Sequence, residues 1–267
     1  MRHPDADADA DAVRVRPAAT VIVARDADAL EVFVLRRTTA AAFAGGMYVF
    51  PGGRVDDADG GPGIAPFCEG LNDVAASAAL DLDRGGLAYW VAAVRECFEE
   101  AGLLLARRSD GGAVVIDDAD RRAVHAGELT MVELCRRDGL VLDLSALRYV
   151  AHWVTPAGEN RRFDTRFFLA VAPPDQEGVH DDTETVHSMW IRPAEALAQV
   201  ERGEILMLPP TIANLRAIAD CRTTAEALAR ADAAGRPPRI APRLRRDAAG
   251  HVTGIALPTD EDYATLA

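Results

Sequence analysis

The stretch Arg95-Glu96-Cys97-Phe98-Glu99-Glu100-Ala101-Gly102-Leu103 decides both the fold and the expected chemistry of this chain. Glu99 and Glu100 follow Glu96 by three and four residues, so that on a helix the three carboxylates share one face. Like charges at this spacing destabilise a helix by about 0.2–0.5 kcal/mol per pair. A divalent cation removes the conflict, because hard cations such as Mg²⁺ prefer carboxylate oxygens. An acidic helix face is more often only a solvated surface, so the neighbouring segments must decide between the two interpretations.

The residues around these glutamates predict a helix over 87–101 with a buried face. The apolar positions at core spacing are Val91, Val94, Phe98, Ala101 and Leu105. Gly102 is expected to end the helix, as glycine commonly does just after the last helical residue.

A second segment upstream, Val49-Phe50-Pro51-Gly52-Gly53, accompanies the acidic helix. Two adjacent glycines permit a tight turn and a close approach of the backbone to a ligand. The presence of this glycine-containing segment together with the acidic helix favours a functional acidic cluster over a solvated helix face.

Together the two segments resemble the Nudix box, whose pattern is Gly, five residues, Glu, seven residues, then Arg-Glu-apolar-x-Glu-Glu-x-Gly-apolar. The second half matches at every specified position from Arg95 to Leu103, and the first half matches at Gly53. The first Glu of the pattern is missing: Asp59 stands at its spacing from Gly53, and Leu87 at its spacing from Arg95. This loss leaves the geometry of the box loop open.

The seven-residue gap of the pattern has grown to run from Gly60 to Val94. In this respect the chain resembles the Nudix branch of peroxisomal coenzyme A diphosphatases, which has a long insert at this point. That branch also has segments similar to 49–53, to Trp153-Val154-Thr155-Pro156 and to 161–169. The resemblance covers roughly residues 18–215.

Alternation of strand and helix patterns predicts an α/β layered domain. The resemblance implies a Nudix α/β/α sandwich with a mixed sheet and the box as a loop–helix–loop, plus an insertion and a C-terminal extension. We expect a disordered acidic N-terminus at 1–16, a Nudix domain at 17–222 with its insert at about 57–86, and a C-terminal helix and tail at 223–267. Expected strands are 18–24, 31–37, 149–155, 162–171 and 187–191. Expected helices are 71–82, 87–101, 118–138, one opening at Pro193, 211–220 and 225–233.

Composition excludes several classes of function. The net charge of −13 argues against nucleic acid or an anionic membrane as the partner. The sequence has no apolar run of about 18 residues, so no membrane span is expected. The four cysteines form no C-x-x-C pair, which suggests neither zinc nor redox work. We expect a cytoplasmic, bacterial protein, and the family makes a homodimer plausible.

The resemblance assigns roles to the box residues. Glu96, Glu99 and Glu100 are the expected ligands of Mg²⁺ or Mn²⁺, and the Gly52 carbonyl is a further candidate ligand. Arg95 is expected to orient one of the glutamates, as groups behind metal ligands commonly do. The general base is either Glu96 or Glu184, since Nudix enzymes often draw an extra glutamate from a loop at about that place.

Substrate binding is expected from arginines, glycine and an aromatic ring near the box. Arginine suits phosphate because its planar fork donates two parallel hydrogen bonds. The candidates are Arg36, Arg37, Phe50, Gly53, Arg162 and Arg166. Phe50 is equally compatible with core packing.

The expected activity is metal-dependent hydrolysis of a nucleoside diphosphate linked to another group. The leading substrate is the diphosphate of coenzyme A or acyl-coenzyme A. One alternative is the same chemistry on ADP-ribose or NADH, because loops and the insert set substrate choice. The other alternative is a Nudix-fold binding module that has lost catalysis, against which the three clustered carboxylates argue.

Overall fold

A computed structural model describes residues 13–41, 44–115 and 117–266 of the chain. Most of the N-terminal segment 1–16 that we expected to be disordered lies outside these residues, and its last two residues already belong to the first strand. No helix in the described part of the chain is long and apolar enough to cross a membrane.

The centre of the molecule is a mixed sheet of eight strands in the order β10-β2-β1-β9-β8-β11, with β3 beside β2 and β4 beside β1. The strands are β1 (Val15–Asp26), β2 (Leu30–Arg37), β3 (Tyr48–Val49), β4 (Gly52–Arg54), β8 (Arg148–Val154), β9 (Arg162–Val171), β10 (Thr185–Ile191) and β11 (Arg239–Ile240). β1 and β9 pair in parallel from Val15↔Arg162 to Ala24↔Val171. Antiparallel pairs join β1 to β2, β2 to β10 and β8 to β9.

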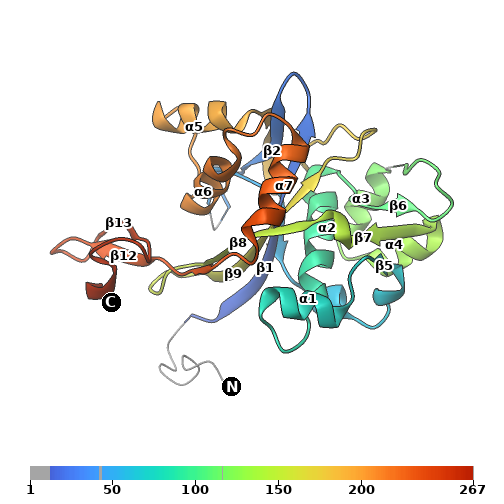
Figure 1. Cartoon of the computed structure of the whole chain (residues 1–267), viewed down its shortest axis with the longest axis horizontal. Helices are drawn as coiled ribbons and strands as arrows, with labels where there is room; N and C mark the ends of the chain where they lie inside the picture. The colour runs from blue at the N-terminus through green and yellow to red at the C-terminus, as the bar shows by residue number, and fades with distance from the viewer. Residues whose placement is uncertain (1–12, 42–43, 116, 267) are drawn as a thin grey trace.

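Helices cover both faces of this sheet (Figure 1). One face carries α1 (Asp73–Leu80), α2 (Leu87–Ala101), α3 (Asp118–His125) and α4 (Met131–Asp138). The other carries α5 (Pro193–Glu201), α6 (Pro209–Ile218) and α7 (Thr224–Ala234). Alternate residues of β9 enter the two cores, with Phe168 on the α2 face and Phe167 on the α6 face. The predicted α/β/α sandwich with a mixed sheet is confirmed.

Two small sheets complete the fold. β7 (Leu140–Asp143) pairs with β5 (Cys68–Glu69) and β6 (Arg107–Arg108), and β12 (Arg243–Arg246) pairs with β13 (Val252–Ala256). The β12–β13 hairpin lies at the left of Figure 1, apart from both helix layers. Short 3₁₀ turns occupy Asp57–Gly60, Ala65–Phe67, Leu144–Ala146 and Tyr263–Thr265.

The box helix α2 has the bounds that the sequence predicts. Gly102 ends it in the left-handed conformation at φ 64°, and its N–H donates to the Phe98 carbonyl. The N-terminal end lacks a side-chain cap from its own N-cap residue Gly86. Asp73 of α1 supplies that function instead, because its carboxylate accepts from the N–H groups of Leu87 at 3.0 Å and Gly85 at 3.1 Å.

The insert is part of the core. Ile64, Ala76 and Leu80 are buried in the same cluster as the apolar face of α2. Gly86 packs against α1 so closely that a Cβ there would lie 2.3 Å from the Ser77 nitrogen. The insert is therefore a packed element beside the box helix, containing the predicted helix in the shorter form of α1.

Three sequence expectations need correction. The predicted helix at 118–138 is two helices, because Gly127 adopts φ 72° and Thr130 begins α4 with a capping box to Glu133. The helix expected at 211–220 starts at Pro209, which suits the first turn. Strand β11 was not expected, and it pairs in parallel with β8 through Arg239↔His152.

Candidate active site

The C-terminal half of α2 gathers the three predicted carboxylates on one side of the helix. Glu99 and Glu100 are 8% and 3% exposed, and the Glu96 side chain is 12% exposed. Charged side chains are rarely buried to this degree unless they are paired. The acidic face of α2 is therefore an enclosed site, which excludes the interpretation as a solvated surface.

Arg95 organises one side of this site. Its Nε and Nη2 donate to the two carboxylate oxygens of Asp59 at 2.8 and 2.9 Å, forming a bidentate ion pair. Its Nη1 donates to Glu96 at 2.9 Å and to Glu99 at 3.1 Å. Nη2 also donates to the Arg54 carbonyl beside the glycine pair. One guanidinium thus fixes two of the predicted ligands and the loop that faces them.

Asp59 is the buried partner of Arg95, and the sequence pattern assigned it no role. It stands six residues after Gly53, where the box has its first glutamate, and it is 2% exposed in the 3₁₀ turn Asp57–Gly60. Its carboxylate also accepts from the Asp56 N–H at 2.8 Å. The shorter side chain therefore still reaches Arg95, and the loop keeps its anchor.

The two glycines of the upstream segment allow β4 to touch the acidic helix. The Gly52 N–H donates to Glu100 Oε2 at 2.9 Å. A Cβ on Gly53 would lie 2.5 Å from Glu96 Oε1, and one on Gly52 would lie 2.5 Å from the Ala19 carbonyl. The glycine pair was predicted to allow close approach of the backbone to a ligand, and in the structure it allows close approach to the carboxylates of Glu96 and Glu100.

Arg37 connects the box to the second candidate base. Its Nη2 donates to Glu184 at 2.9 Å, and its Nη1 lies 3.5 Å from Glu100. The Glu184 backbone carbonyl also accepts from the Thr38 N–H at 2.9 Å. Glu184 is half exposed, so it stands at the open side of the site while Glu100 forms its floor.

Burial raises the pKa values of all three glutamates. The pKa of Glu96 rises to about 7, chiefly through burial, with the Glu99 charge adding to the effect and Arg95 opposing it. Burial and the Glu96 charge hold the pKa of Glu100 well above its usual range, and burial raises that of Glu99. The site thus lacks positive charge, because Arg37 and Arg95 face five carboxylates: Asp59, Glu96, Glu99, Glu100 and Glu184.

This chemistry fits a hard divalent cation. Carboxylate oxygens whose pKa values are raised by burial and mutual repulsion gain stability from a multivalent counter-charge. Within the described ranges, however, no three His, Cys, Asp or Glu side chains already converge in the arrangement of a metal site. Arg95 Nη1 stands between Glu96 and Glu99, hydrogen-bonded to both.

Other predicted substrate residues lie away from the glutamates. Arg36 and Arg37 are neighbours on β2 and point to opposite faces, so Arg36 is exposed on the face that carries Val34 and the α5–α6 layer. Phe50 is 2% exposed in that same core. Of the two interpretations for Phe50, core packing describes its position.

The two arginines of β9 face the α2 side but not the carboxylates. Arg166 is 3% exposed and contacts Asp164, His152 and the ring of Tyr89 in the first turn of α2. Arg162 donates from Nε to the Thr155 carbonyl at 3.2 Å. Arg166 thus lies beside the first turn of α2, whereas the three glutamates belong to the C-terminal half of that helix.

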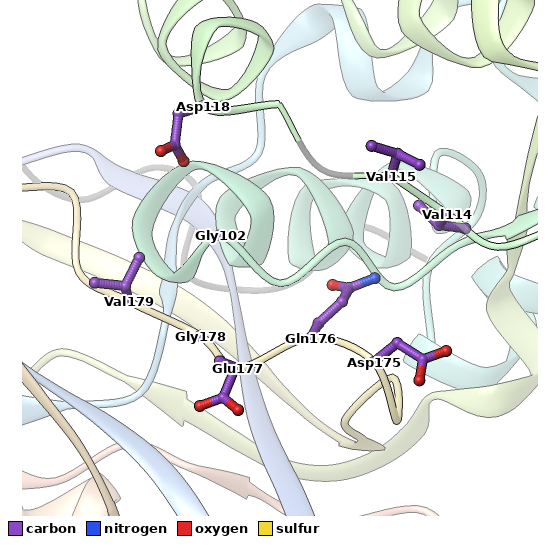
Figure 2. Close-up of a pocket in the computed structure, with 9 residues that line it drawn as sticks. All are labelled: Gly102, Val114, Val115, Asp118, Asp175, Gln176, Glu177, Gly178 and Val179. Carbon is purple, nitrogen blue, oxygen red and sulfur yellow. The ribbon is translucent and has the colours of Figure 1, made fainter.

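A polar face of α3 was missed by the sequence analysis. Asp118, Arg121, Arg122 and His125 follow one another at helical spacing and line a cavity together with Glu99 and residues 179–183. His125 Nδ1 lies 3.6 Å from Glu99 Oε2. A second hollow, shown in Figure 2, adjoins it: Asp118 and Val179 line both, on either side of Gly102. The periodicity of the charged residues in 118–125 was the available signal.

The chain is similar to several known proteins. The family model of the NUDT19 Nudix domain matches residues 72–218. The acyl-coenzyme A diphosphatase NUDT19 of Gallus gallus is 30% identical over 229 residues, covering 69% of this chain and 60% of that protein. The Homo sapiens protein of the same name is 28% identical over 231 residues, covering 73% and 62%. The chain thus spans about 60% of the length of these curated relatives.

A solved structure extends the likeness over the fold. The crystal structure of a NUDIX hydrolase from Alicyclobacillus acidocaldarius superposes with a TM-score of 0.69 and 29% sequence identity. The match covers 81% of this chain and 96% of that chain.

Proposed function

Because this chain belongs to the Nudix family, with most of its central region matching the NUDT19 Nudix domain, we propose that it hydrolyses the diphosphate of coenzyme A or acyl-coenzyme A. Water would attack one phosphorus atom of the diphosphate and break its bond to the bridging oxygen. The products are 4′-phosphopantetheine, or its acyl form, and 3′,5′-ADP. The observation that carries the proposal is the enclosed group of Glu96, Glu99 and Glu100, of which Arg95 holds the first two and the Gly52 N–H holds the third.

Glu96, Glu99 and Glu100 would hold Mg²⁺ or Mn²⁺, which when bound neutralises phosphate oxygens and lowers the pKa of a bound water. Positioning and electrostatics supply most of the catalysis in phosphoryl transfer. In this chain Arg95 sets the side-chain direction of Glu96 and Glu99, and Asp59 fixes Arg95 in turn. The Gly52 N–H holds Glu100.

We propose Glu184 as the general base. The carboxylates of Glu184 and Glu96 both accept from an arginine at 2.9 Å, but Glu184 is half exposed and therefore reachable by water, whereas Glu96 is largely enclosed. Arg37, 2.9 Å from Glu184, keeps that carboxylate at the edge of the acidic group. A base needs to be within hydrogen-bond reach of the water that it deprotonates. The position of Arg37 also makes it the predicted arginine best placed to meet the substrate phosphates.

The substrate assignment draws on the two acyl-coenzyme A diphosphatases described above. The assay is a panel of coenzyme A, acetyl-coenzyme A, ADP-ribose and NADH, each with Mg²⁺ and with Mn²⁺. We expect coenzyme A esters to give the highest kcat/KM and the two products named above. A preference for ADP-ribose or NADH would replace this substrate while keeping the chemistry.

Variants of the carboxylates test the site. Glu99→Gln and Glu100→Gln keep the side-chain volume and should lower kcat by about 10²-fold or more. Glu201→Gln on the exposed end of α5 is the matched control and should keep wild-type kcat, since it lies on the opposite helix layer. Full activity in both box variants would refute the assignment of these glutamates. A wild-type chain that binds nucleotides but hydrolyses none of the substrates would favour the binding module. The cytoplasmic location and the homodimer stay predictions.

A further inference from the structure

The cavity beside Glu99 is built by a face of α3 that the proposed reaction leaves unused. It has a volume of about 320 Å³ and lies between α3 and the loop 179–183 that precedes β10. Three basic side chains of α3, Arg121, Arg122 and His125, line it, and His180 lines it from the loop. The cavity therefore places basic side chains directly beside Glu99, which belongs to the acidic site.

Arg121 is the buried part of this wall. It is 6% exposed, its Nε donates to the Glu99 carbonyl at 2.8 Å, and its Nη1 lies 3.4 Å from the His180 carbonyl. No group in the described ranges accepts from its Nη2, which is itself buried. A buried guanidinium with an unused donor is costly unless a further acceptor arrives. Arg121 thus brings a buried, unpartnered Nη2 donor to the cavity wall, with the charges of Asp181, Asp118 and Asp182 close to its guanidinium.

Two of the acids that line the cavity are already engaged. Asp181 accepts hydrogen bonds from Thr183, Thr185 and the Glu184 N–H within its own loop. Asp182 is 84% exposed and pairs with His180 at 3.1 Å. Arg122 and His125, by contrast, are exposed on the cavity side of α3. Glu99 also lines the cavity and is engaged by Arg95 at 3.1 Å and by His125 at 3.6 Å. In the described part of the chain, the donors left for a ligand are therefore those of Arg122 and the Nη2 of Arg121, with Asp118 as the remaining acid of the lining.

We propose that this cavity binds a phosphomonoester of the substrate, separate from the diphosphate that is cleaved. A phosphomonoester carries about two negative charges and three acceptor oxygens, which suit the donors of Arg122 and His125 and the buried charge of Arg121. The neighbouring hollow in Figure 2 is lined by Val114, Val115 and Val179 together with the acids Asp118, Asp175 and Glu177, and its valines leave room for the uncharged part of the same ligand.

This inference rests on the proposed function and adds a reason for its substrate class. Coenzyme A has a 3′-phosphate on its ribose, whereas ADP-ribose and NADH have none. A cavity for that phosphate beside Glu99 selects coenzyme A from other nucleoside diphosphate derivatives. Recognition of a charged group that competitors lack is an effective source of specificity, because the unused buried donors penalise the wrong ligand.

The test measures binding without turnover. Isothermal titration with 3′,5′-ADP and with 5′-AMP compares two ligands that differ only in the 3′-phosphate. We expect 3′,5′-ADP to bind at least about tenfold more tightly, the effect of one or two charge-assisted hydrogen bonds. In Arg122→Ala that ratio should fall several-fold, and in Arg122→Ala/His125→Asn it should approach one. Arg216→Ala, an exposed arginine of α6, is the control and should keep the ratio.

Kinetics on coenzyme A and dephospho-coenzyme A provide the second readout. The preference for coenzyme A should reside in KM, and Arg122→Ala should reduce it by a similar factor. Equal binding of 3′,5′-ADP and 5′-AMP, or a ratio that survives both substitutions, would overturn the cavity assignment while coenzyme A hydrolysis still upheld the proposed function. Tight, Arg122-dependent binding of 3′,5′-ADP without coenzyme A hydrolysis would uphold the cavity and overturn the function.

Discussion

Asp59 and Arg95 form a two-point ion pair in which both carboxylate oxygens accept from the guanidinium, at 2.8 and 2.9 Å. Asp59 belongs to the turn after the glycine pair, and Arg95 belongs to the helix that carries the glutamates. The pair therefore joins the two halves of the motif across the 35 residues 60–94.

Removal of Asp59 should be costly to stability and to activity. Asp59 is 2% exposed and the Arg95 side chain 12%, and breaking such a buried pair by removing one partner costs about 3 kcal/mol. We expect Asp59→Ala to lower the free energy of unfolding by that amount in urea titrations. It should also lower kcat, because Arg95 then loses its direction toward Glu96. Asp57→Ala in the same turn is exposed and is the control; equal stabilities of the two variants would refute the role of the pair.

The stability of the metal-free protein should fall as the pH rises. The Glu96 pKa is raised from 4.5 to about 7, so the folded state holds a proton that the unfolded chain releases. Its contribution is complete below pH 4.5 and is lost as the pH rises toward 7. In EDTA we expect Tm to decrease across that window. Mg²⁺ should raise Tm more at pH 8 than at pH 5.5, since the cation takes the place of the proton.

Glu96→Gln is the matched variant for this pH experiment. It removes the titrating group and should flatten the decrease of Tm in EDTA. A metal-free Tm that rises between pH 5 and 7 in the wild-type protein would contradict the sign derived from burial of Glu96.

The two box glycines should respond differently to alanine. The Gly53→Ala methyl meets the far end of the flexible Glu96 side chain, whereas the Gly52→Ala methyl meets the backbone of Ala19 and Thr20. We expect Gly53→Ala to keep most of its stability but to lose kcat as Glu96 is displaced. Gly52→Ala should lower Tm as well. Thermal unfolding and kcat measured on both variants check these expectations. An unaltered kcat in Gly53→Ala would contradict the predicted displacement of Glu96.

The insert should contribute to the stability of the box helix through Asp73. The backbone donors Leu87 and Gly85 hold the pKa of Asp73 below its usual value, so its contribution is present above the unfolded pKa and is lost as the pH falls through the folded one. Asp73→Ala should cost about 1 kcal/mol, the usual worth of a cap. Asp83→Ala, exposed in the connection between α1 and α2, is the control. Identical denaturation midpoints at pH 7 would exclude the capping role.

Local patterns predicted the parts of the fold that periodicity determines. The helix at 87–101 and the strand at 162–171 have the expected bounds, because apolar spacing and the flanking Gly102 and Pro173 specify them. The break between α3 and α4 depends on a positive φ at Gly127, which the apolar pattern does not report. Strand β11 is two residues long, and only its pairing with β8 makes it a strand.

The candidate site also has parts that local sequence patterns predicted and parts that depend on tertiary contacts. Spacing on one helix was enough to group Glu96, Glu99 and Glu100, and adjacent glycines were enough to indicate close approach. Side-chain alternation along a strand already separates Arg36 from Arg37, but which of the two faces the glutamates depends on how β2 packs between the two cores, which a single sequence does not fix. The cavity beside Glu99 needs α3 and the loop 179–183 to meet, and that contact is tertiary.

The reach of Asp73 across the junction of α1 and α2 has a consequence for how such chains are recognised and redesigned. A pattern search with fixed spacing fails on this sequence, although its paired residues meet in space as the short motif would have them meet. Shortening the segment between Asp59 and Arg95 to seven residues would delete Asp73, whose carboxylate caps the N-terminal end of α2. An engineered minimal version must therefore bring its own serine, threonine or aspartate to that helix end before the acidic site can form.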